Sequence, residues 1–204
     1  LHLFSEADNF GSLLTPKLED QQSAKLLSYL QENKESFEQQ SLFAQETLQK
    51  IKIALKQANY LSQKYQVVIA NPPYMGGRGM NQRMGTWLRE NYEPVKSDLF
   101  SAFIVRNTKL AIPKGQLGFM TPFVWMFISS YEKLRLFLLN EKTITSLIQL
   151  EYSGFDGATV LICTFTIENA YNKNFKGGYV RLSDFKGADQ QGPHRARGAA
   201  DGVQ

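Results

Sequence analysis

Residues that build metal centres and disulfides are scarce in this chain of 204 residues. Its one cysteine, Cys163, cannot form an intrachain disulfide, and the apolar run around it predicts a small, buried hydrophobic side chain. The two histidines, His2 and His194, stand near opposite ends of the chain. They support neither a histidine-rich metal site nor a histidine-based triad, so we expect a site that requires no metal.

Long apolar runs are missing too. The longest, 117–128, contains Pro122 and falls short of the ~20 residues that span a bilayer, and the sequence shows no signal peptide. We therefore expect a cytoplasmic, globular protein that contacts no membrane. With 43% hydrophobic residues the chain can build one core. Its net charge of +4 permits contact with nucleic acid without requiring it.

The most informative segment is Asn71-Pro72-Pro73-Tyr74, which directly follows the apolar, β-branched run 65–70. Such a run predicts a strand buried on both faces, as in the centre of a parallel sheet. Two prolines cannot continue a strand ladder, so the strand should end at Asn71. The Asn-Pro-Pro-Tyr motif should then lie at the carboxyl end of a central strand, where open α/β sheets bind their ligands.

This motif suits chemistry on a planar amino group. The exocyclic amine of adenine is a poor nucleophile because its lone pair is delocalised into the ring. The side-chain oxygen of Asn71 and the main-chain carbonyl of Pro72 can each accept a hydrogen bond from one N–H of this amine. The prolines restrict the backbone, so both acceptors are already oriented before the base binds. Tyr74 offers a flat face for base stacking, worth ~1–3 kcal/mol. A turn that simply closes a strand is the plainer interpretation of the same residues.

Further segments follow the motif in order. They are the glycine-rich loop 75–81, Lys96-Ser97-Asp98-Leu99-Phe100 at the start of a helical pattern, the turn and strand of 114–125, and 154–160, which precedes a β-rich run. In this order the segments resemble motifs IV, V, VI and VIII of the γ-class adenine-N6 DNA methyltransferases. They are similar in particular to the large methyltransferases of BREX phage defence (the PglX family) and of type IIG restriction–modification systems. The resemblance covers roughly Phe10 to Gln191.

The resemblance implies a reaction, a cofactor and residue roles. The reaction is methyl transfer from S-adenosylmethionine to N6 of an adenine flipped out of double-stranded DNA. It implies catalytic roles for Asn71, Pro72 and Tyr74, and an adenine pocket that includes Pro73, Asp98, Phe100 and Phe155, with Phe155 stacked on the second face of the base. A helix cap is an equally good interpretation of Asp98, and a core aromatic is the plainer one of Phe155.

The glycine-rich cofactor loop of this family, a Phe-x-Gly-x-Gly pattern, is not found before residue 65. We therefore interpret the chain as an internal fragment that lacks the cofactor-binding loop and the target-recognition region. Its expected partners are double-stranded DNA, the remainder of the same enzyme and other subunits of the defence system. After Gly192 the apolar periodicity ends, which motivates the hypothesis that 192–204 is an irregular, non-native tail.

Periodicity predicts an α/β fold: the second half of a Rossmann-like, S-adenosylmethionine-dependent methyltransferase sheet with a helical insertion before the catalytic motif. Residues 1–17 should end an upstream methyltransferase segment, 18–64 should form a helical hairpin and 65–191 the catalytic half. In that half we expect helices over 98–111 and 123–140 and strands over 116–121, 145–150, 158–168 and 179–182, with an antiparallel pair at the end of the sheet.

Two questions stay open at the level of sequence. Arg78, in the glycine-rich loop, suits contact with DNA phosphates, but a solvated surface arginine is the plainer interpretation. The same tetrapeptide also occurs in methyltransferases that modify glutamine amides of release factors or bases in RNA, although the helical insertion and the Ser-Asp-Leu-Phe segment favour DNA. A third possibility is an inactive, truncated remnant.

Overall fold

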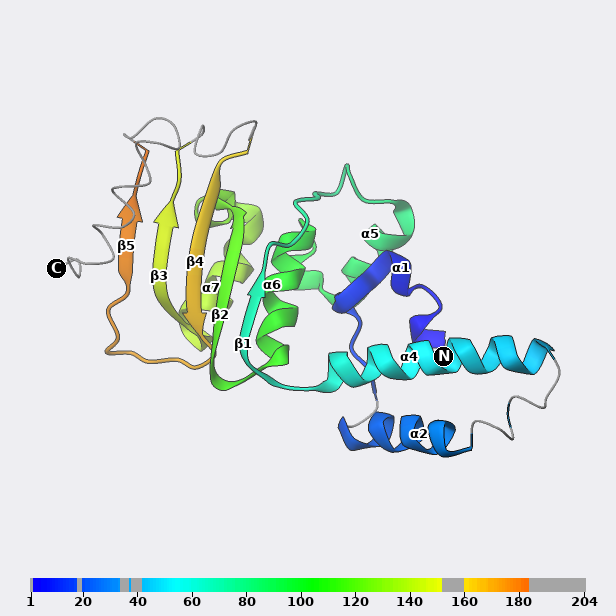
Figure 1. Ribbon diagram of the computed structural model, residues 1–204. Coiled ribbons are helices and arrows are strands. Elements are labelled where there is room, and N and C mark those ends of the chain that lie inside the picture. The colour runs from blue at the N-terminus through cyan, green and yellow to red at the C-terminus, as the bar shows by residue number, and fades with distance from the viewer. Residues whose placement is uncertain (1, 18–19, 34–36, 38–41, 152–159, 184–204) are drawn as a thin grey trace. The chain divides into compact units, whose positions relative to one another are not determined.

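The computed structural model describes residues 2–17, 20–33, 37, 42–151 and 160–183, which belong to two compact units, Leu1–Lys64 and Tyr65–Gln204 (Figure 1). The predicted division into 1–17, 18–64, 65–191 and a tail over 192–204 stays a prediction. Among the helices of the described ranges, none combines the length and the apolar character that crossing a membrane requires.

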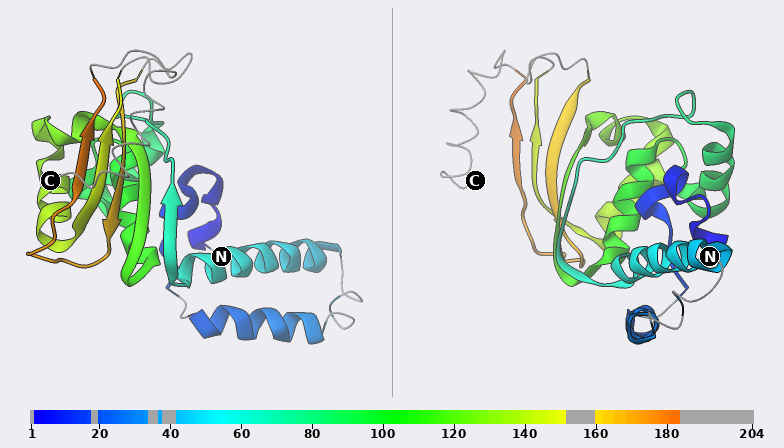
Figure 2. Two further views of the ribbon diagram at one scale, coloured as in Figure 1. Left: turned by 60° about the vertical axis from the view of Figure 1, so that its left-hand side comes forward. Right: turned by 45° about the vertical axis from the view of Figure 1, so that its right-hand side comes forward.

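The N-terminal unit is helical. Short turns of helix, His2–Phe4 (η1), Ala7–Phe10 (α1) and Gly11–Leu13 (η2), precede the two longer helices α2 (Asp20–Glu32) and α4 (Leu42–Ser62). The two longer helices lie side by side as a hairpin (Figures 1 and 2). Helix α4 has one apolar stripe, in which Leu55 and Ala58 are buried and Leu48 and Ile51 are half-buried.

The C-terminal unit is built on a mixed sheet with the strand order β1-β2-β4-β3-β5. Strand β1 runs parallel to β2, strand β4 runs antiparallel to both of its neighbours, and β5 runs parallel to β3. The predicted α/β class is therefore confirmed. The antiparallel pair that the sequence predicts at the end of the sheet lies inside it instead, because β4 runs antiparallel between β2 and β3 while the outer pairs β1–β2 and β3–β5 are parallel. The strands are β1 (Tyr65–Ala70), β2 (Ala111–Pro122), β3 (Thr143–Gln149), β4 (Ile162–Glu168) and β5 (Gly178–Arg181).

The prediction of a central strand buried on both faces is wrong for β1. Among the described residues β1 pairs with β2 alone and forms one edge of the sheet. The side chain of Val67 is 58% exposed and that of Ile69 is 81% exposed. Apolar composition shows what a strand can bury, but the described residues place no neighbour on the second edge of this strand.

The helices of this unit are α5 (Gln82–Asn91), α6 (Leu99–Leu110) and α7 (Glu132–Glu141), with single turns η3 (Glu93–Val95), η4 (Phe123–Met126) and η5 (Ser129–Tyr131). Helices α6 and α7 lie on the same face of the sheet (Figures 1 and 2). The helix predicted over 98–111 is confirmed as α6.

The helix predicted over 123–140 is wrong in its first half, where two separate 3₁₀ turns replace it. Trp125 is buried, and its indole N–H donates to the Thr121 hydroxyl at 3.2 Å, which ties the first turn back to β2. Arg135 donates to the carbonyls of Trp125 and Ile128, both at 2.7 Å, and so satisfies two groups that a continuous helix would have paired internally. Tertiary contacts override the local helical pattern here.

The predicted strand over 116–121 is longer in the structure, because β2 begins at Ala111 and includes Pro113 and Gly115. The pairing of β2 with β1 shifts register between Tyr65 and Val67, so a bulge absorbs the proline. Lys114 adopts a positive φ of 62° in this bulge. A Cβ on Gly115 would lie 2.9 Å from the Ile112 carbonyl oxygen, so the bulge needs a glycine there.

Candidate functional site

The Asn-Pro-Pro-Tyr motif directly follows β1, which ends at Ala70 as the sequence predicts. The motif therefore leaves the sheet at the carboxyl end of β1. Asn71 and Pro73 are exposed, Pro72 is buried and Tyr74 is half-buried. The residue with the side-chain acceptor is thus accessible to a ligand, while the buried Pro72 fixes the path of the chain beneath it.

Within the motif, the first and last side chains contact each other. The Tyr74 hydroxyl lies 2.9 Å from the Asn71 side-chain oxygen and donates a hydrogen bond to it. Burial of the ring raises the pKa of Tyr74, and the nearby Cys163 raises it further. The phenol therefore stays protonated at neutral pH and remains a donor. Since an amide oxygen has two lone pairs, Asn71 keeps one acceptor position for a second partner.

The ring of Tyr74 is supported from below by a small apolar cluster. Leu150, Ile162 and Leu182 form this cluster, and Tyr74 packs against it. Leu150 directly follows β3, Leu182 directly follows β5 and Ile162 begins β4, so three strands of the sheet position the residues that pack against the ring. The arrangement is suited to present an aromatic face next to the amide of Asn71.

Cys163 is fully buried and forms no disulfide, which confirms the prediction of a small core residue. Burial raises the pKa of its thiol, and the Thr121 hydroxyl lies 3.7 Å from the sulfur. A protonated, inaccessible thiol is a poor nucleophile, so this residue belongs to the core under the site.

Asp98 is buried and connects two segments. It caps α6, because its Oδ1 accepts the backbone N–H of Phe100 at 3.2 Å. The same oxygen accepts the N–H of Met75, the residue after the motif, at 2.9 Å. An isolated antiparallel bridge between Gly76 and Asp98, with the Leu99 N–H donating to the Met75 carbonyl at 3.1 Å, completes the junction.

Burial is the main reason why the pKa of Asp98 is raised, and the backbone N–H groups of Met75, Phe100 and Leu99 oppose that effect. Because the Asp98 side chain accepts the Phe100 N–H at the start of α6, the capping interpretation is confirmed. The bond to Met75 is a contact that sequence reasoning missed, since nothing local connects residues 23 positions apart. Whether Asp98 also lines an adenine pocket stays a prediction.

The other predicted pocket residues differ in their surroundings. Phe100 is fully buried, and its ring centroid lies 5.3 Å from that of Tyr131. Burial, and then the charge of Asp98, raise the pKa of Tyr131 to about 12. Phe100 thus packs in the core behind the Asp98 junction, and its part in a pocket stays a prediction. Phe155 lies outside the described residues.

Arg78 is exposed in the glycine-rich loop, where the N–H of Gly79 donates to the Gly76 carbonyl at 2.8 Å and closes a tight turn. Its guanidinium is therefore accessible, and its contact with DNA stays a prediction.

An open groove of about 490 Å³ begins at Asn71 and continues over the face of the sheet. Apart from the Asn71 amide, its walls are glycine, apolar side chains and hydroxyl side chains, and no carboxylate contributes to them. Among the residues that the structure describes, no group of histidine, cysteine and acidic side chains is arranged to hold a metal ion. The lining residues are Ile69, Ala70, Asn71, Gly118, Phe119, Met120, Ser146, Ile148, Thr164, Phe165 and Thr166.

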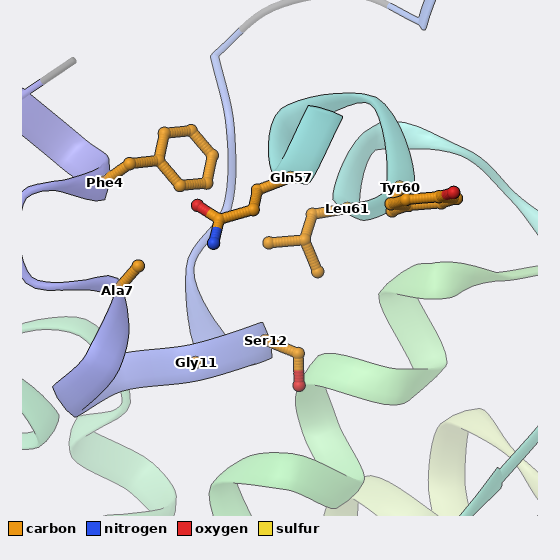
Figure 3. A pocket seen from close by; sticks show the side chains of 7 residues that line it. All are labelled: Phe4, Ala7, Gly11, Ser12, Gln57, Tyr60 and Leu61. Carbon is orange, nitrogen blue, oxygen red and sulfur yellow. The ribbon is translucent and has the colours of Figure 1, made fainter. Parts of the chain in front are cut away.

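The N-terminal unit has a small pocket of its own, about 280 Å³ in volume (Figure 3). Figure 3 shows the Gln57 amide near the ring of Phe4, while Ser12 lies on another wall, apart from the rings of Phe4 and Tyr60. These walls hold no acid or base that could take a proton at neutral pH. The Asn-Pro-Pro-Tyr motif, where accessible polar groups converge, remains the candidate site.

Curated relatives of the chain are adenine-specific methyltransferases. The chain is 33% identical over 187 residues to the adenine-specific methyltransferase BrxX of Escherichia coli O9:H4 (strain HS), which covers 90% of this chain and 15% of that protein. It is 32% identical over 128 residues to the adenine-specific methyltransferase PglX of Lacticaseibacillus casei (strain Zhang), covering 61% of this chain and 11% of that protein. The chain therefore spans a small part of the length of these relatives.

Solved structures show the same fold at low identity. The DrdV–DNA complex is similar with a TM-score of 0.54 and 14% identity, covering 71% of this chain and 17% of that one. The Type ISP restriction-modification enzyme LlaGI, in complex with a DNA substrate mimic, is similar with a TM-score of 0.52 and 17% identity, covering 74% and 17%. Residues 3–155, most of the sequence, match one family, and the chain belongs to it: the Eco57I restriction-modification methylases.

Proposed function

We propose that the protein of which this chain is a part transfers a methyl group to N6 of adenine in double-stranded DNA, within a restriction–modification or BREX phage-defence system. The observation that carries the proposal is the exposed Asn71 amide at the carboxyl end of β1, held by the Tyr74 hydroxyl at 2.9 Å. Family membership and the names of the relatives support it, because BrxX and PglX are adenine-specific methyltransferases.

In the proposed reaction the flipped adenine lies on the Tyr74 ring, whose other side rests on the cluster of Leu150, Ile162 and Leu182. The second lone pair of the Asn71 oxygen accepts a hydrogen bond from one N–H of the adenine amine, and the Pro72 carbonyl accepts one from the other N–H. These two hydrogen bonds draw the hydrogens out of the plane of the ring. The nitrogen becomes more tetrahedral, and its lone pair becomes available for the methyl group. Phe155 would stack on the second face of the base.

S-adenosylmethionine would supply the methyl group in this reaction. The described residues do not fit that cofactor on their own. The groove beside Asn71 has no carboxylate that could bind ribose hydroxyls, and the described residues before β1 contain no glycine-rich turn. Binding of the cofactor would therefore depend on the remainder of the same enzyme. The roles proposed for the residues of this chain concern the adenine and the DNA alone. DNA and the other subunits of such a system are the remaining proposed partners, with Arg78 exposed for a phosphate contact.

The test is Asn71→Ala in the whole enzyme. Loss of a preorganised polar contact to the reacting group should lower the methyl transfer rate by ~100-fold or more, while DNA binding persists. Asn91→Ala is the matched control, since that exposed amide bonds the Trp87 carbonyl within α5. Transfer of radiolabelled methyl to duplex DNA, RNA and a release factor would be compared in parallel.

A near-normal rate in the Asn71 variant would refute the role of the motif. Labelling of RNA or of a glutamine side chain in place of duplex DNA would replace the proposed substrate. No labelling of any of the three by the whole enzyme would favour an inactive remnant.

A further inference from the structure

A second polar surface lies on the helical hairpin of the N-terminal unit. A groove of about 730 Å³ runs between α2 and α4. Helix α2 contributes Leu27 and Gln31 to its walls, and α4 contributes Gln49, Lys52, Ile53, Lys56, Asn59 and Tyr60. Nothing in the proposed methyl transfer uses this groove.

Hydrogen-bond donors dominate the polar lining of the groove. Two ammonium groups, three side-chain amides and a phenol contribute to it, and no carboxylate does. Lys52 is half-buried and Lys56 is exposed, so one stem rests between the helices while both charges can reach the opening. Such a lining fits an anionic ligand with several oxygen acceptors.

The two lysines are neighbours on α4. They are four residues apart, about 6 Å along the axis, and therefore on one face of the helix. No acidic residue stands three or four positions from either of them. Within the described ranges neither ammonium forms an ion pair. Two like charges at this spacing disfavour an isolated helix by ~0.2–0.5 kcal/mol, a cost that an anionic partner would remove.

We propose that this groove binds the sugar–phosphate backbone of DNA. The inference rests on the proposed function, because that function makes DNA the ligand. Lys52 and Lys56 would contact neighbouring phosphates of one strand, and the amides of Gln31, Gln49 and Asn59 would donate to phosphate or sugar oxygens. Contacts of this kind add affinity and orientation without reading the base sequence. The hairpin would therefore hold the duplex, while the target sequence is recognised elsewhere.

The salt dependence of DNA binding tests the proposal in the whole enzyme. Removing two phosphate contacts with Lys52→Gln and Lys56→Gln together should reduce the slope of log K against log salt by ~1.8. Affinity for a fluorescent duplex should fall at low salt, and kcat at saturating DNA should not change. Lys25→Gln with Lys50→Gln is the matched control, since it removes the same charge from α2 and α4 at positions outside the groove.

The proposal would be overturned if Lys52→Gln with Lys56→Gln left the slope of log K against log salt unchanged. It would also be overturned if the control variant reduced this slope by the same amount. Lys52→Arg with Lys56→Arg keeps both charges and must preserve the slope, which separates charge from folding. Loss of binding to an acidic peptide or to single-stranded RNA, with duplex binding intact, would assign the groove to another partner and reject DNA. If wild-type enzyme binds duplex without methylating it, the proposed function fails while the slopes still decide the role of the groove.

Discussion

Replacing Asp98 should loosen the segment that follows the Asn-Pro-Pro-Tyr motif. Its Oδ1 accepts the N–H groups of Met75 at 2.9 Å and of Phe100 at 3.2 Å. The second bond caps α6, and the first holds the exit of the motif against that cap. Asp98 is thus a positioning residue for Tyr74 in the proposed reaction, acting through the adjacent Met75.

The magnitude follows from these two bonds. Asp98→Ala removes a helix cap worth ~1 kcal/mol. It also leaves the Met75 N–H without its partner, at a cost of ~1 kcal/mol, the low end of the usual range because Met75 is partly exposed. The free energy of unfolding should therefore fall by about 2 kcal/mol. Asp98→Asn keeps an acceptor oxygen, and Asn caps helices about as well as Asp, so its change should be small.

Urea unfolding and steady-state methylation would be measured on the whole wild-type enzyme, on its Asp98→Ala variant and on its Asp98→Asn variant. We expect Asp98→Ala to lower kcat as well as stability, and Asp98→Asn to restore both. If Asp98→Asn is as damaging as Asp98→Ala, the acceptor oxygen is not what matters. If Asp98→Ala lowers stability and leaves kcat unchanged, Asp98 is a cap alone.

The pH dependence has a definite sign. Burial raises the pKa of Asp98 above its value in the unfolded chain, so folding disfavours the ionised carboxyl. Its contribution to stability is complete below the unfolded pKa and is lost as the pH rises through the folded pKa. Relative to the Asp98→Asn variant, the wild-type protein should therefore gain stability as the pH falls through that range. A relative loss on acidification would contradict the assigned cause.

Two further substitutions each test one contact, and the second has a matched control in the chain. Tyr74→Phe keeps the stacking ring but removes the donor to Asn71, worth ~1 kcal/mol, so kcat should fall several-fold with little change in KM for DNA. Steady-state kinetics would show this, and an unchanged kcat would mean that Asn71 needs no help from the hydroxyl. Gly177→Ala places a Cβ 2.5 Å from the Ile144 carbonyl oxygen and should destabilise the protein by ~1–3 kcal/mol. Gly178→Ala, where a Cβ meets nothing within 4 Å, is the control, and equal thermal melting of the two variants would refute the steric argument.

Local chemistry made part of this structure predictable. The end of β1 follows from two prolines that cannot donate to a ladder, and the start of α6 follows from an aspartate ahead of an apolar helical pattern. The burial of Cys163 follows from its apolar neighbours. Each of these features depends on residues within a few positions of one another, which is the range over which sequence patterns act.

The wrong predictions fall where the local structure depends on contacts with residues outside the local sequence pattern. Arg135 stabilises the break in the helix expected over 123–140 by donating to the carbonyls of Trp125 and Ile128, which lie 10 and 7 positions earlier, farther than the three- to four-residue spacing of a helical pattern. Pro113 is accommodated by a bulge whose geometry depends on pairing with β1. The 81% exposure of the Ile69 side chain depends on what packs over its face of the sheet, and no residue of β1 encodes that.

The candidate site combines both kinds of information. The sequence predicts an acceptor at Asn71 and a stacking ring at Tyr74 from the chemistry of each residue alone. The structure adds that the intervening prolines turn the chain so that the two side chains meet at 2.9 Å. A phenol can donate to an amide oxygen or accept from an amide NH₂ group. In this structure it donates to the Asn71 oxygen, and burial raises the pKa of Tyr74, so the phenol keeps the proton that this bond needs. In the opposite orientation the NH₂ group of Asn71 would face the hydrogens of an adenine amine and repel them. The bond from the Tyr74 hydroxyl is thus compatible with the orientation of Asn71 that the proposed reaction needs, and it holds that side chain in place before any base arrives.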